Sequence, residues 1–470
     1  MMGPASAVRR PSRRLFLLLG ALLSVAALGA LMAAGAWPSG AAEAAGDAFV
    51  QDAPVVLESV EASLPLVITP TWAQTGAWGG NHDGVATAPR TVYVTGLRSG
   101  DSSIDLSLTK YVDGALRWER LYDGPAQRTD QGCAIAARGT AIYTAGVRQS
   151  LRGDLDLVLV RWDSAGDRLW TRAYDSGARL DEWAHGVAVD GDGNVTVVGS
   201  SGTPTSDDDW VIISYKADGT QRYVRRYDSP AHLADSPAKM LVDSAGNVYV
   251  AGTSESATNG MDAFLVKYSK AGDRLWTRRY NGTANAYDTA TSLRARPGGG
   301  VYVAGRTESV ATGYDGLLLA YTAAGTRLFV VAEAGSDISA ESGQIFRDLE
   351  VLPGGDIICG GSTSLETVDR FWAVYSPTGE LRDRTVDDTG DGITHMAKDG
   401  QGGVLLTGTA SDSTGVQVLT ERISIGGTNW RCIWPESPAS DYEPMAVFTN
   451  GVNAYIVGDS VQSFVLGHVY

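Results

Sequence analysis

The chain has 470 residues, and its formal net charge at pH 7 is −16. The first 42 residues contain four arginines and no acid, so the remainder sums to −20. A chain this acidic is a poor partner for nucleic acid, because the two would repel each other. The 20% of charged residues is ordinary for a soluble protein, and the 57 glycines suit a fold with many tight turns.

Residues 1–44 resemble an export signal. Four arginines at positions 9, 10, 13 and 14 precede an uncharged run from Leu15 to Ala42, and Ala42-Glu43-Ala44 has the small residues that a signal peptidase recognises. The segment Ser12 to Leu17 is similar to a bacterial twin-arginine signal, although arginine-rich general-secretion signals look much the same. An uncleaved anchor stays open as an alternative, since the apolar run is long enough to cross a bilayer. We expect cleavage and a periplasmic, cell-surface or secreted protein.

A unit of about fifty residues then repeats to the end of the chain. The second predicted strand of each copy ends in a glycine, and successive glycines lie 47 to 56 residues apart. These glycines are Gly96, Gly146, Gly199, Gly252, Gly305, Gly361, Gly408 and Gly458. A second marker keeps the same period, namely an aromatic residue four positions after a turn glycine. Its copies are Gly114/Trp118, Gly166/Trp170, Gly219/Tyr223, Gly272/Trp276, Gly325/Phe329 and Gly426/Trp430. This period is typical of a β-propeller blade.

The fourth copy shows how a unit divides into four strands. We predict strands at Lys239 to Val242, Val248 to Gly252, Ala263 to Tyr268 and Leu275 to Tyr280. The third is a continuous apolar run and is expected to be covered on both faces. The fourth mixes bulky apolar and charged residues, as a half-exposed strand does. The strands are therefore expected to run from the inside of the ring to the outside.

The two ends of the chain predict how the ring closes. The last copy offers three strands, at Pro444 to Phe448, Ala454 to Gly458 and Ser463 to Tyr470, and lacks an outer strand. Leu64 to Trp72 has the composition of an outer strand without a blade, so the N-terminus is expected to complete the last blade. We predict an all-β propeller of four-stranded blades over residues 64–470, preceded by a linker at 45–63. Eight blades are favoured, and seven remain possible if copies six and seven merge.

Aspartates recur at two positions of the repeat. One set follows the second strand: Asp105, Asp156, Asp209, Asp262, Asp315 and Asp369. The other set opens the first strand: Asp83, Asp130, Asp181, Asp235, Asp288, Asp391 and Asp441. Both sets are expected on the same face of the ring, either as loop caps or as an acidic rim for cations or basic partners. Capping is the preferred interpretation, because a specific ligand site usually breaks the symmetry of a repeat.

Other signals of chemistry are few. Asp190 to Asn194 alternates oxygen ligands as a calcium loop does, but it occupies the first hairpin turn and lacks the completing glutamate, so a plain turn is expected. The three cysteines, Cys133, Cys359 and Cys432, are expected to be buried and unpaired. Four of the five histidines, His82, His185, His232 and His395, fall near the starts of first strands, and His468 lies near the chain end. We name no catalytic, cofactor-binding or metal-binding residue.

In Asp243 to Gly252, Asp262 to Tyr268 and Gly272 to Tyr280 the chain resembles the bacterial SBBP (seven-bladed β-propeller) repeat family. That resemblance implies an exported or surface protein and brings no catalytic residue. Gly166 to Trp170 is also similar to a motif of quinoprotein propellers. The function expected first is a non-catalytic binding or scaffold module, monomeric, with an extracytoplasmic protein or glycan as partner. The alternatives are a polysaccharide-active hydrolase or lyase and a quinone-dependent dehydrogenase.

Ligand contacts are expected where the repeat is broken. The candidate places are the loops Ser362 to Asp369 and Ser411 to Val416, and the channel mouth near His185 and His395.

Overall fold

The computed structural model describes residues 66–68, 72–75, 81–88, 90–99, 103–258, 260–334, 343–363, 369–387, 391–412, 415–424, 429–434, 443–449, 453–459 and 464–469. The predicted export signal and linker lie outside these ranges. Within the described residues every regular element is a β-strand, and no helix is available that could cross a membrane.

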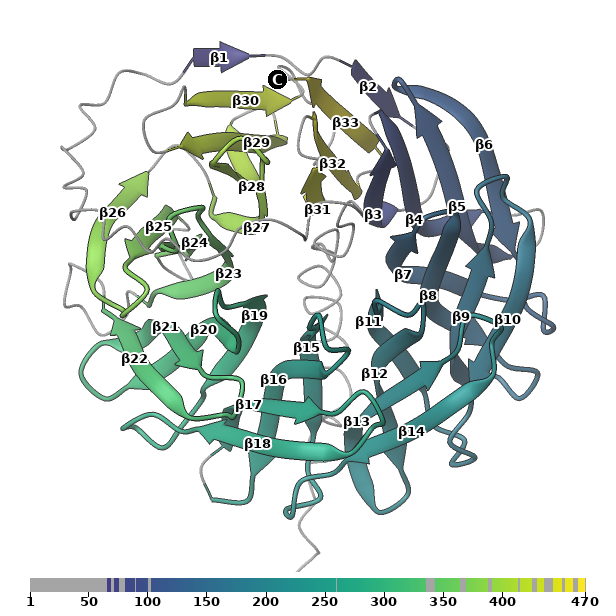
Figure 1. The fold of residues 1–470 in the computed structure, drawn as a ribbon, viewed down its shortest axis with the longest axis horizontal. Coiled ribbons are helices and arrows are strands. Elements are labelled where there is room, and N and C mark those ends of the chain that lie inside the picture. The colour runs from purple at the N-terminus through teal and green to yellow at the C-terminus, as the bar shows by residue number, and fades with distance from the viewer. Residues whose placement is uncertain are drawn as a thin grey trace, which may run out of the picture.

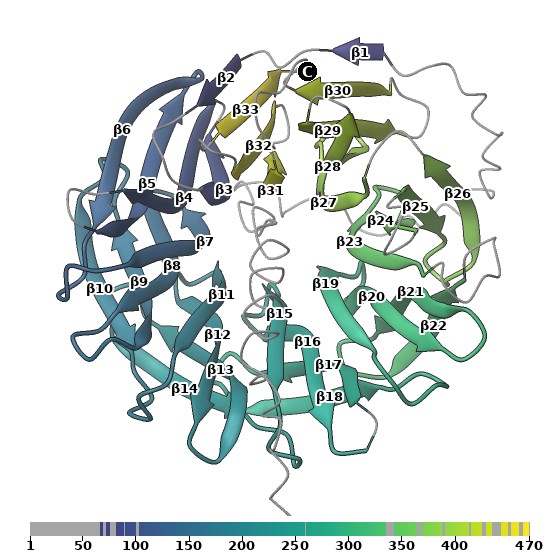
Figure 2. The same cartoon turned by 180° about the vertical axis from the view of Figure 1, so that it is seen from behind.

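The strands form a ring of sheets around a central axis (Figures 1 and 2). Blades 1 to 4 contain the following strands: β3 (Asn81–Ala88), β4 (Thr91–Ser99), β5 (Ile104–Val112) and β6 (Ala115–Tyr122); β7 (Asp130–Arg138), β8 (Ala141–Gln149), β9 (Leu155–Trp162) and β10 (Arg168–Tyr174); β11 (Glu182–Val189), β12 (Val195–Thr203), β13 (Ser206–Tyr215) and β14 (Gln221–Tyr227); β15 (Asp235–Val242), β16 (Val248–Ser256), β17 (Gly260–Tyr268) and β18 (Arg274–Tyr280).

Blades 5 to 7 contain β19 (Thr289–Ala295), β20 (Val301–Ser309), β21 (Gly313–Tyr321) and β22 (Arg327–Glu333); β23 (Ile345–Val351), β24 (Ile357–Ser362), β25 (Arg370–Tyr375) and β26 (Leu381–Asp387); β27 (Ile393–Lys398), β28 (Gly403–Asp412), β29 (Gly415–Ser424) and β30 (Trp430–Trp434). Blade 8 contains β31 (Glu443–Thr449), β32 (Asn453–Asp459) and β33 (Phe464–Val469).

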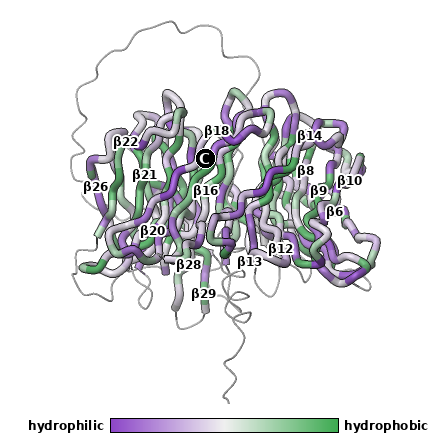
Figure 3. The backbone as a smooth tube through the Cα atoms, turned by 90° about the horizontal axis from the view of Figure 1, so that it is seen from below, coloured by the Kyte–Doolittle hydropathy of each residue, from purple (hydrophilic) through white to green (hydrophobic). Residues whose placement is uncertain are grey.

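The expected propeller of four-stranded antiparallel blades is confirmed. The described strands form eight sheets, one for each marker glycine, and copies six and seven make separate sheets. The first strand of each blade contacts the first strand of the next, and β31 contacts β3, which closes the ring. The strands run between the two faces of the ring, with apolar residues concentrated along their middles (Figure 3).

The ring is closed by an N-terminal strand, as expected, but by one that shares only Trp72 with the predicted Leu64 to Trp72. The strand that completes blade 8 is β2 (Trp72–Thr75), which pairs antiparallel with β33. The preceding stretch forms β1 (Leu66–Ile68), which instead pairs parallel with β30 as a fifth strand of blade 7. Pro70 lies between them in the sequence, and proline cannot donate a hydrogen bond to a sheet. The N-terminal segment therefore fastens two blades rather than one (Figure 1).

The marker glycines have a steric cause. The first strand of a blade carries a β-bulge, as between Gly132 and Ala134 of β7, and Gly146 of β8 pairs with Gly132 beside it. A Cβ at Gly146 would lie 1.9 Å from the carbonyl oxygen of Gln131, which is impossible. The corresponding distance at Gly305 is 1.8 Å, to Thr289. The bulge in each first strand thus fixes a glycine in each second strand.

The core lies between neighbouring sheets. From blade 3, Trp210 and Ile212 of β13 pack against Val250 and Phe264 of blade 4, and all four are buried. The third strands are covered on both faces, as predicted, whereas the outer strands are half exposed. Apolar clusters of this kind recur between neighbouring blades around the ring.

Candidate functional site at the blade junctions

Three carboxylates meet where the chain passes from the outer strand of one blade to the first strand of the next. One opens the third strand, the second follows the outer strand, and the third opens the next blade. In each group the potential ligand atoms lie within 4.8 Å of one another. We call these groups the junction clusters: Asp105/Asp123/Asp130 between blades 1 and 2, Asp156/Asp175/Glu182 between blades 2 and 3, and Asp209/Asp228/Asp235 between blades 3 and 4.

The acid that opens each first strand caps the loop before it. The backbone amide of Ser229 donates to Oδ2 of Asp235 at 2.7 Å, and that of Gly124 donates to Oδ2 of Asp130 at 2.5 Å. Glu182 accepts from the amide of Ser176 at 3.3 Å. The predicted capping role is therefore confirmed for one oxygen each of Asp130 and Asp235, and in blade 3 Glu182 takes this role at a position that was not predicted.

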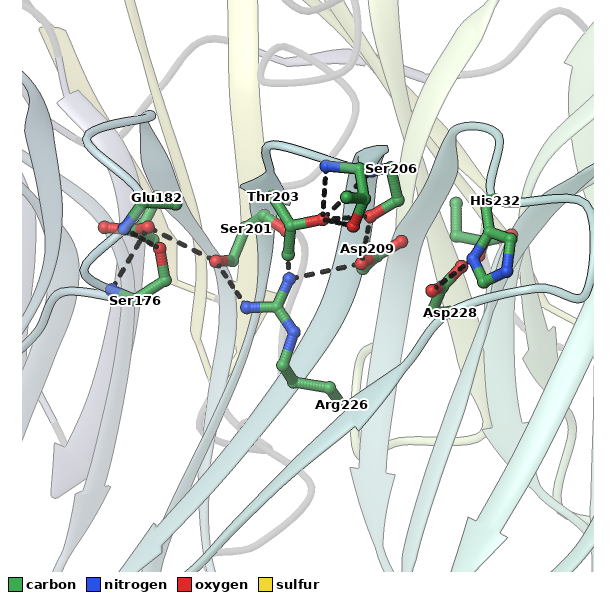
Figure 4. A network of polar contacts seen from close by, with 12 residues as sticks. Ser176, Glu182, Ser201, Thr203, Ser206, Asp209, Arg226, Asp228 and His232 are labelled. Carbon is green, nitrogen blue, oxygen red and sulfur yellow. Dashed lines mark hydrogen bonds and ion pairs between the residues drawn. The ribbon is translucent and has the colours of Figure 1, made fainter.

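The acid of the third strand is held by its own blade. Oδ2 of Asp209 accepts from the Ser206 hydroxyl at 2.8 Å and from the Arg226 guanidinium at 3.2 Å. Figure 4 shows Arg226 and Asp209 pointing toward one another, with Asp228 and His232 on the loop beside them. Oδ2 of Asp156 pairs with Arg148 in the same way, at 3.0 Å.

The middle acid forms the open side of each cluster. Asp123, Asp175 and Asp228 are exposed, whereas the other two members of each cluster are buried. Asp228 accepts from Nδ1 of His232 at 2.7 Å when that nitrogen carries a proton. Each cluster thus has two buried walls and one side that faces water.

Several buried carboxylate oxygens of the clusters have no hydrogen-bond partner in the described part of the chain. They are Oδ1 of Asp130, Asp156, Asp209 and Asp235, and Oε2 of Glu182. These five residues are at most 3% exposed. A buried anionic oxygen without a donor is costly, so each such atom requires an explanation.

The pKa values reflect this environment. Burial raises the pKa of Glu182 to about 7, although hydrogen bonds from Ser176 and Ser201 oppose the shift. Burial also raises the pKa values of Asp130 and Asp235 to about 6. Hydrogen bonds oppose the shift, from the Ser254 side chain and the Ser229 amide at Asp235 and from backbone amides at Asp130, and the neighbouring carboxylates add to it. An oxygen-only set of crowded carboxylates is suited to a hard cation such as Ca²⁺ or Mg²⁺.

The cluster weakens further along the ring. Between blades 4 and 5, Asp262 and Asp288 keep their places, but Asn281 replaces the middle acid. Between blades 5 and 6, Asp315 has Gln344 at the start of the next blade. The charge needed for a cation is thus concentrated in the first three junctions.

The two predicted aspartate sets are largely but not entirely correct. In blade 3 the first strand opens with Glu182, and the predicted Asp181 lies one residue outside it. Asp83 lies beyond the bulge of β3, so it belongs to another position of the repeat. Asp441 lies outside the described residues. The middle acids were not predicted at all, although Tyr122-Asp123, Tyr174-Asp175 and Tyr227-Asp228 recur in the sequence.

Asp83 belongs to a charged group in the central channel. Its carboxylate accepts from the amides of Gly84 at 2.8 Å and of Ile135 in blade 2 at 2.9 Å, and burial raises its pKa to about 7. Burial lowers the pKa of Lys239 in blade 4 to about 8, against the attraction of Asp348 in blade 6. Asp348 lies 3.2 Å from Arg294 of blade 5. The amide contact of Asp83 thus joins blade 1 to blade 2, and the Arg294–Asp348 ion pair joins blade 5 to blade 6.

The predicted histidines do not form one group. His82 contacts the carbonyl oxygen of Gly132 at 2.7 Å, His185 contacts the Ser200 hydroxyl at 3.0 Å, and His395 contacts the Thr394 hydroxyl at 2.9 Å. They belong to blades 1, 3 and 7, and His232 lies in the junction loop of blade 3. The side chain of His468 is outside the described residues.

Two further predictions are confirmed. The three cysteines are buried and form no disulfide, and burial raises their thiol pKa values, for Cys133 and Cys432 to about 12. The segment from Asp190 to Asn194 is a hairpin turn, in which Oδ1 of Asp190 accepts from the amides of Asp192 and Asn194.

A cavity of about 610 Å³ opens beside the third cluster. It lies between the junction loop of blade 3 and strands β16, β17 and β18. Tyr227 and Phe264, stacked with ring centroids 4.4 Å apart, form part of its wall, with Glu255 and Arg279. The wall thus combines aromatic surface with charges of both signs.

Comparisons with known proteins agree with the fold. No family model matches the chain. Regulatory protein FlaEY of Caulobacter vibrioides is 25% identical over 319 residues, which cover 56% of this chain and 32% of FlaEY. The chain therefore spans about a third of that relative's length.

Among solved structures, Sqt1 of Chaetomium thermophilum bound to the N-terminus of ribosomal protein L10 has a TM-score of 0.53 and 14% identity, and covers 86% of this chain and 99% of its own. A second Sqt1 structure from the same organism has a TM-score of 0.52 and 13% identity, and covers 85% of this chain and all of its own. These likenesses support a β-propeller and leave the SBBP resemblance as a prediction.

Proposed function

We propose that this protein is an exported, non-catalytic β-propeller that binds a protein partner through the rim bearing the junction clusters. The observation that carries the proposal is the cavity beside the third cluster. Its volume of about 610 Å³ suits one or two side chains of a bound segment. Export rests on the signal-like residues 1–44, and the polysaccharide-active and quinone-dependent alternatives stay untested predictions.

The lining of the cavity favours a protein segment. Stacked Tyr227 and Phe264 offer an apolar wall, while Glu255 and Arg279 offer charges that can orient a peptide. Tyrosine and arginine are enriched where protein interfaces gain most of their binding energy. The structural neighbour Sqt1 was solved with a protein segment, the N-terminus of ribosomal protein L10. A propeller ring of this kind is therefore a suitable support for peptide binding.

The test selects ligands for the purified protein from residue 45 onward. A displayed library of random peptides and an array of bacterial cell-wall glycans are presented in parallel. Thr277→Trp, which fills the cavity, and Glu255→Ala, which removes a wall charge, are expected to weaken selected peptides at least tenfold. Both variants should melt close to the parent protein.

Glu380→Ala is the matched control, because Glu380 is exposed in the turn between β25 and β26, on the opposite face of the ring. It should leave peptide binding unchanged. Selection of glycans alone, or peptides that bind both cavity variants as well as the parent, would contradict the proposal.

A further inference from the structure

We propose that the three junction clusters are calcium sites that fasten blades 1 to 4 to one another. Each cluster joins carboxylates of two consecutive blades within 4.8 Å. An ion held there bridges the third and outer strands of one blade to the first strand of the next. This inference is independent of the proposed partner surface.

Loop capping does not explain the clusters completely. The cap on the amide of Ser229 uses one oxygen of Asp235 and does not involve the middle acid Asp228. Between blades 4 and 5 the same cap is present, since the amide of Gly282 donates to Asp288 at 2.7 Å, yet Asn281 stands at the middle position. The cap of the first-strand acid therefore forms without a third carboxylate, and the middle residues bond within their own loops, as Asp175 accepts from the amide of Gly177 at 2.6 Å.

The carboxylate oxygens that do not take part in capping indicate a further role for the clusters. Oδ1 of Asp209 and Oδ1 of Asp235 are buried without a donor, in residues that are 1% and 0% exposed. Asp130 and Glu182 repeat this arrangement in the other two clusters, and Asp262 and Asp288 repeat it between blades 4 and 5, where only two carboxylates meet. A bound cation would give these oxygens a positively charged partner, which no described protein atom provides.

The donor set selects the ion. All three residues of each cluster offer carboxylate oxygens, whereas zinc and copper prefer nitrogen or sulfur. Ca²⁺ accepts six to eight oxygens in flexible geometry and takes water on an open side, which matches the exposed Asp123, Asp175 and Asp228. Mg²⁺ demands a strict octahedron, so it is expected to compete weakly.

Terbium luminescence provides the test. Tb³⁺ replaces Ca²⁺ at oxygen sites and is excited by a nearby aromatic ring. Tyr122, Tyr174 and Tyr227 each directly precede the middle acid of a cluster. The chelator-treated protein from residue 45 onward is expected to bind three ions by calorimetry and to sensitise Tb³⁺, and Ca²⁺ should displace Tb³⁺ at far lower concentration than Mg²⁺.

Variants assign the signal to the clusters. Asp228→Asn keeps the loop cap and the buried walls but removes the third charge, so the stoichiometry should fall from three to two. Asn281→Asp completes the cluster between blades 4 and 5 and should raise the stoichiometry to four. Asp315→Asn is the matched control, because the next blade begins there with Gln344, whose backbone amide donates to the carbonyl oxygen of Tyr314, rather than with an acid. It should leave three ions bound.

Two results would overturn the inference. One is a chelator-treated protein that neither binds Ca²⁺ nor sensitises Tb³⁺ while its melting curve shows it to be folded. The other is binding that Asp228→Asn and Asn281→Asp leave unchanged, since the ions would then lie elsewhere on the acidic surface.

Discussion

Single residues join the blades of this ring, and the turn glycines are the clearest case. Gly219 of blade 3 packs on Trp170 of blade 2, and Gly272 of blade 4 packs on Tyr223 of blade 3. The indole of Trp170 donates to the carbonyl oxygen of Ala217, and Arg172 donates to that of Gly219. The turn glycine and the aromatic residue of the second periodic marker thus meet across blade boundaries, not within one blade.

Replacing Gly219 by alanine should destabilise the ring. Gly219 has φ of +83°, and a Cβ there would lie 2.6 Å from the Arg172 guanidinium and 3.1 Å from the Trp170 ring. The left-handed backbone and the contact together should lower the free energy of unfolding by about 2 kcal/mol. Urea denaturation measures the loss. Gly191→Ala is the control, because no atom lies within 4 Å of its Cβ position, and an equal loss in both variants would refute this explanation.

His185 should make stability depend on pH. Burial lowers the pKa of His185 to about 4, below the ordinary value of 6.5. Protonation therefore favours the unfolded chain, so this contribution is complete above pH 6.5 and is lost as the pH falls toward 4. Between pH 7.5 and pH 5, His185→Gln should lose about 1 kcal/mol less than the parent, because the ring is only partly buried. If urea titrations show that the parent and His185→Gln lose the same free energy of unfolding between the two pH values, His185 does not have this role.

The site could be predicted from sequence only in part. Asp130 and Asp235 were found because they recur at a fixed place in the repeat. Glu182 was missed, since the neighbouring Asp181 offered the residue type that the pattern required. The middle acids were missed because their proximity to the others depends on how consecutive blades pack, which a pattern within one repeat does not contain.

At the scale of the element, strand order and phase followed from local signals. Turn residues and the glycine of each second strand placed the strands of blade 4 correctly, although β15 begins at Asp235 rather than Lys239 and Gly252 lies within β16 rather than at its end. The N-terminal strand was less predictable. Its composition indicated an unpaired edge strand, but Pro70 divides it, and the partners of the two pieces depend on the closed ring.

Truncation should separate the two pieces. A protein beginning at residue 70 keeps β2 but loses β1, and one beginning at residue 76 loses both. The first should melt slightly lower than the protein from residue 45, whereas the second exposes the edge of β33 and should melt much lower and aggregate. Differential scanning fluorimetry and light scattering follow both effects. Equal melting of all three proteins would show that β2 does not close the ring.

At the scale of the whole molecule, the ring followed from the period alone, because a sheet of four strands must bury its faces against copies of itself. The face that carries the clusters also followed from strand order. The sequence did not show which irregular segments of the repeat contribute to ligand binding. The loops Ser362 to Asp369 and Ser411 to Val416 lie partly outside the described residues, so ligand binding there stays a prediction.

Export can be tested on the intact chain. Replacing Arg13 and Arg14 by lysine should strongly reduce transport if the twin-arginine route is used, because that route reads the arginine pair rather than its charge. Fractionation of cells followed by immunoblotting measures the transported share. Undiminished transport would leave general secretion as the route.

The pairing of β2 with β33, which completes blade 8, also determines the order in which the blades assemble. The four antiparallel strands of every other blade are consecutive in the chain, whereas Trp72 in β2 must pair with Gly467 in β33. Loop-closure entropy makes such a distant encounter slow, so short-range blades form first. Strand β2 is consequently synthesised before blades 1 to 7 but pairs after them, and the ring stays open until β33 of blade 8 has been synthesised.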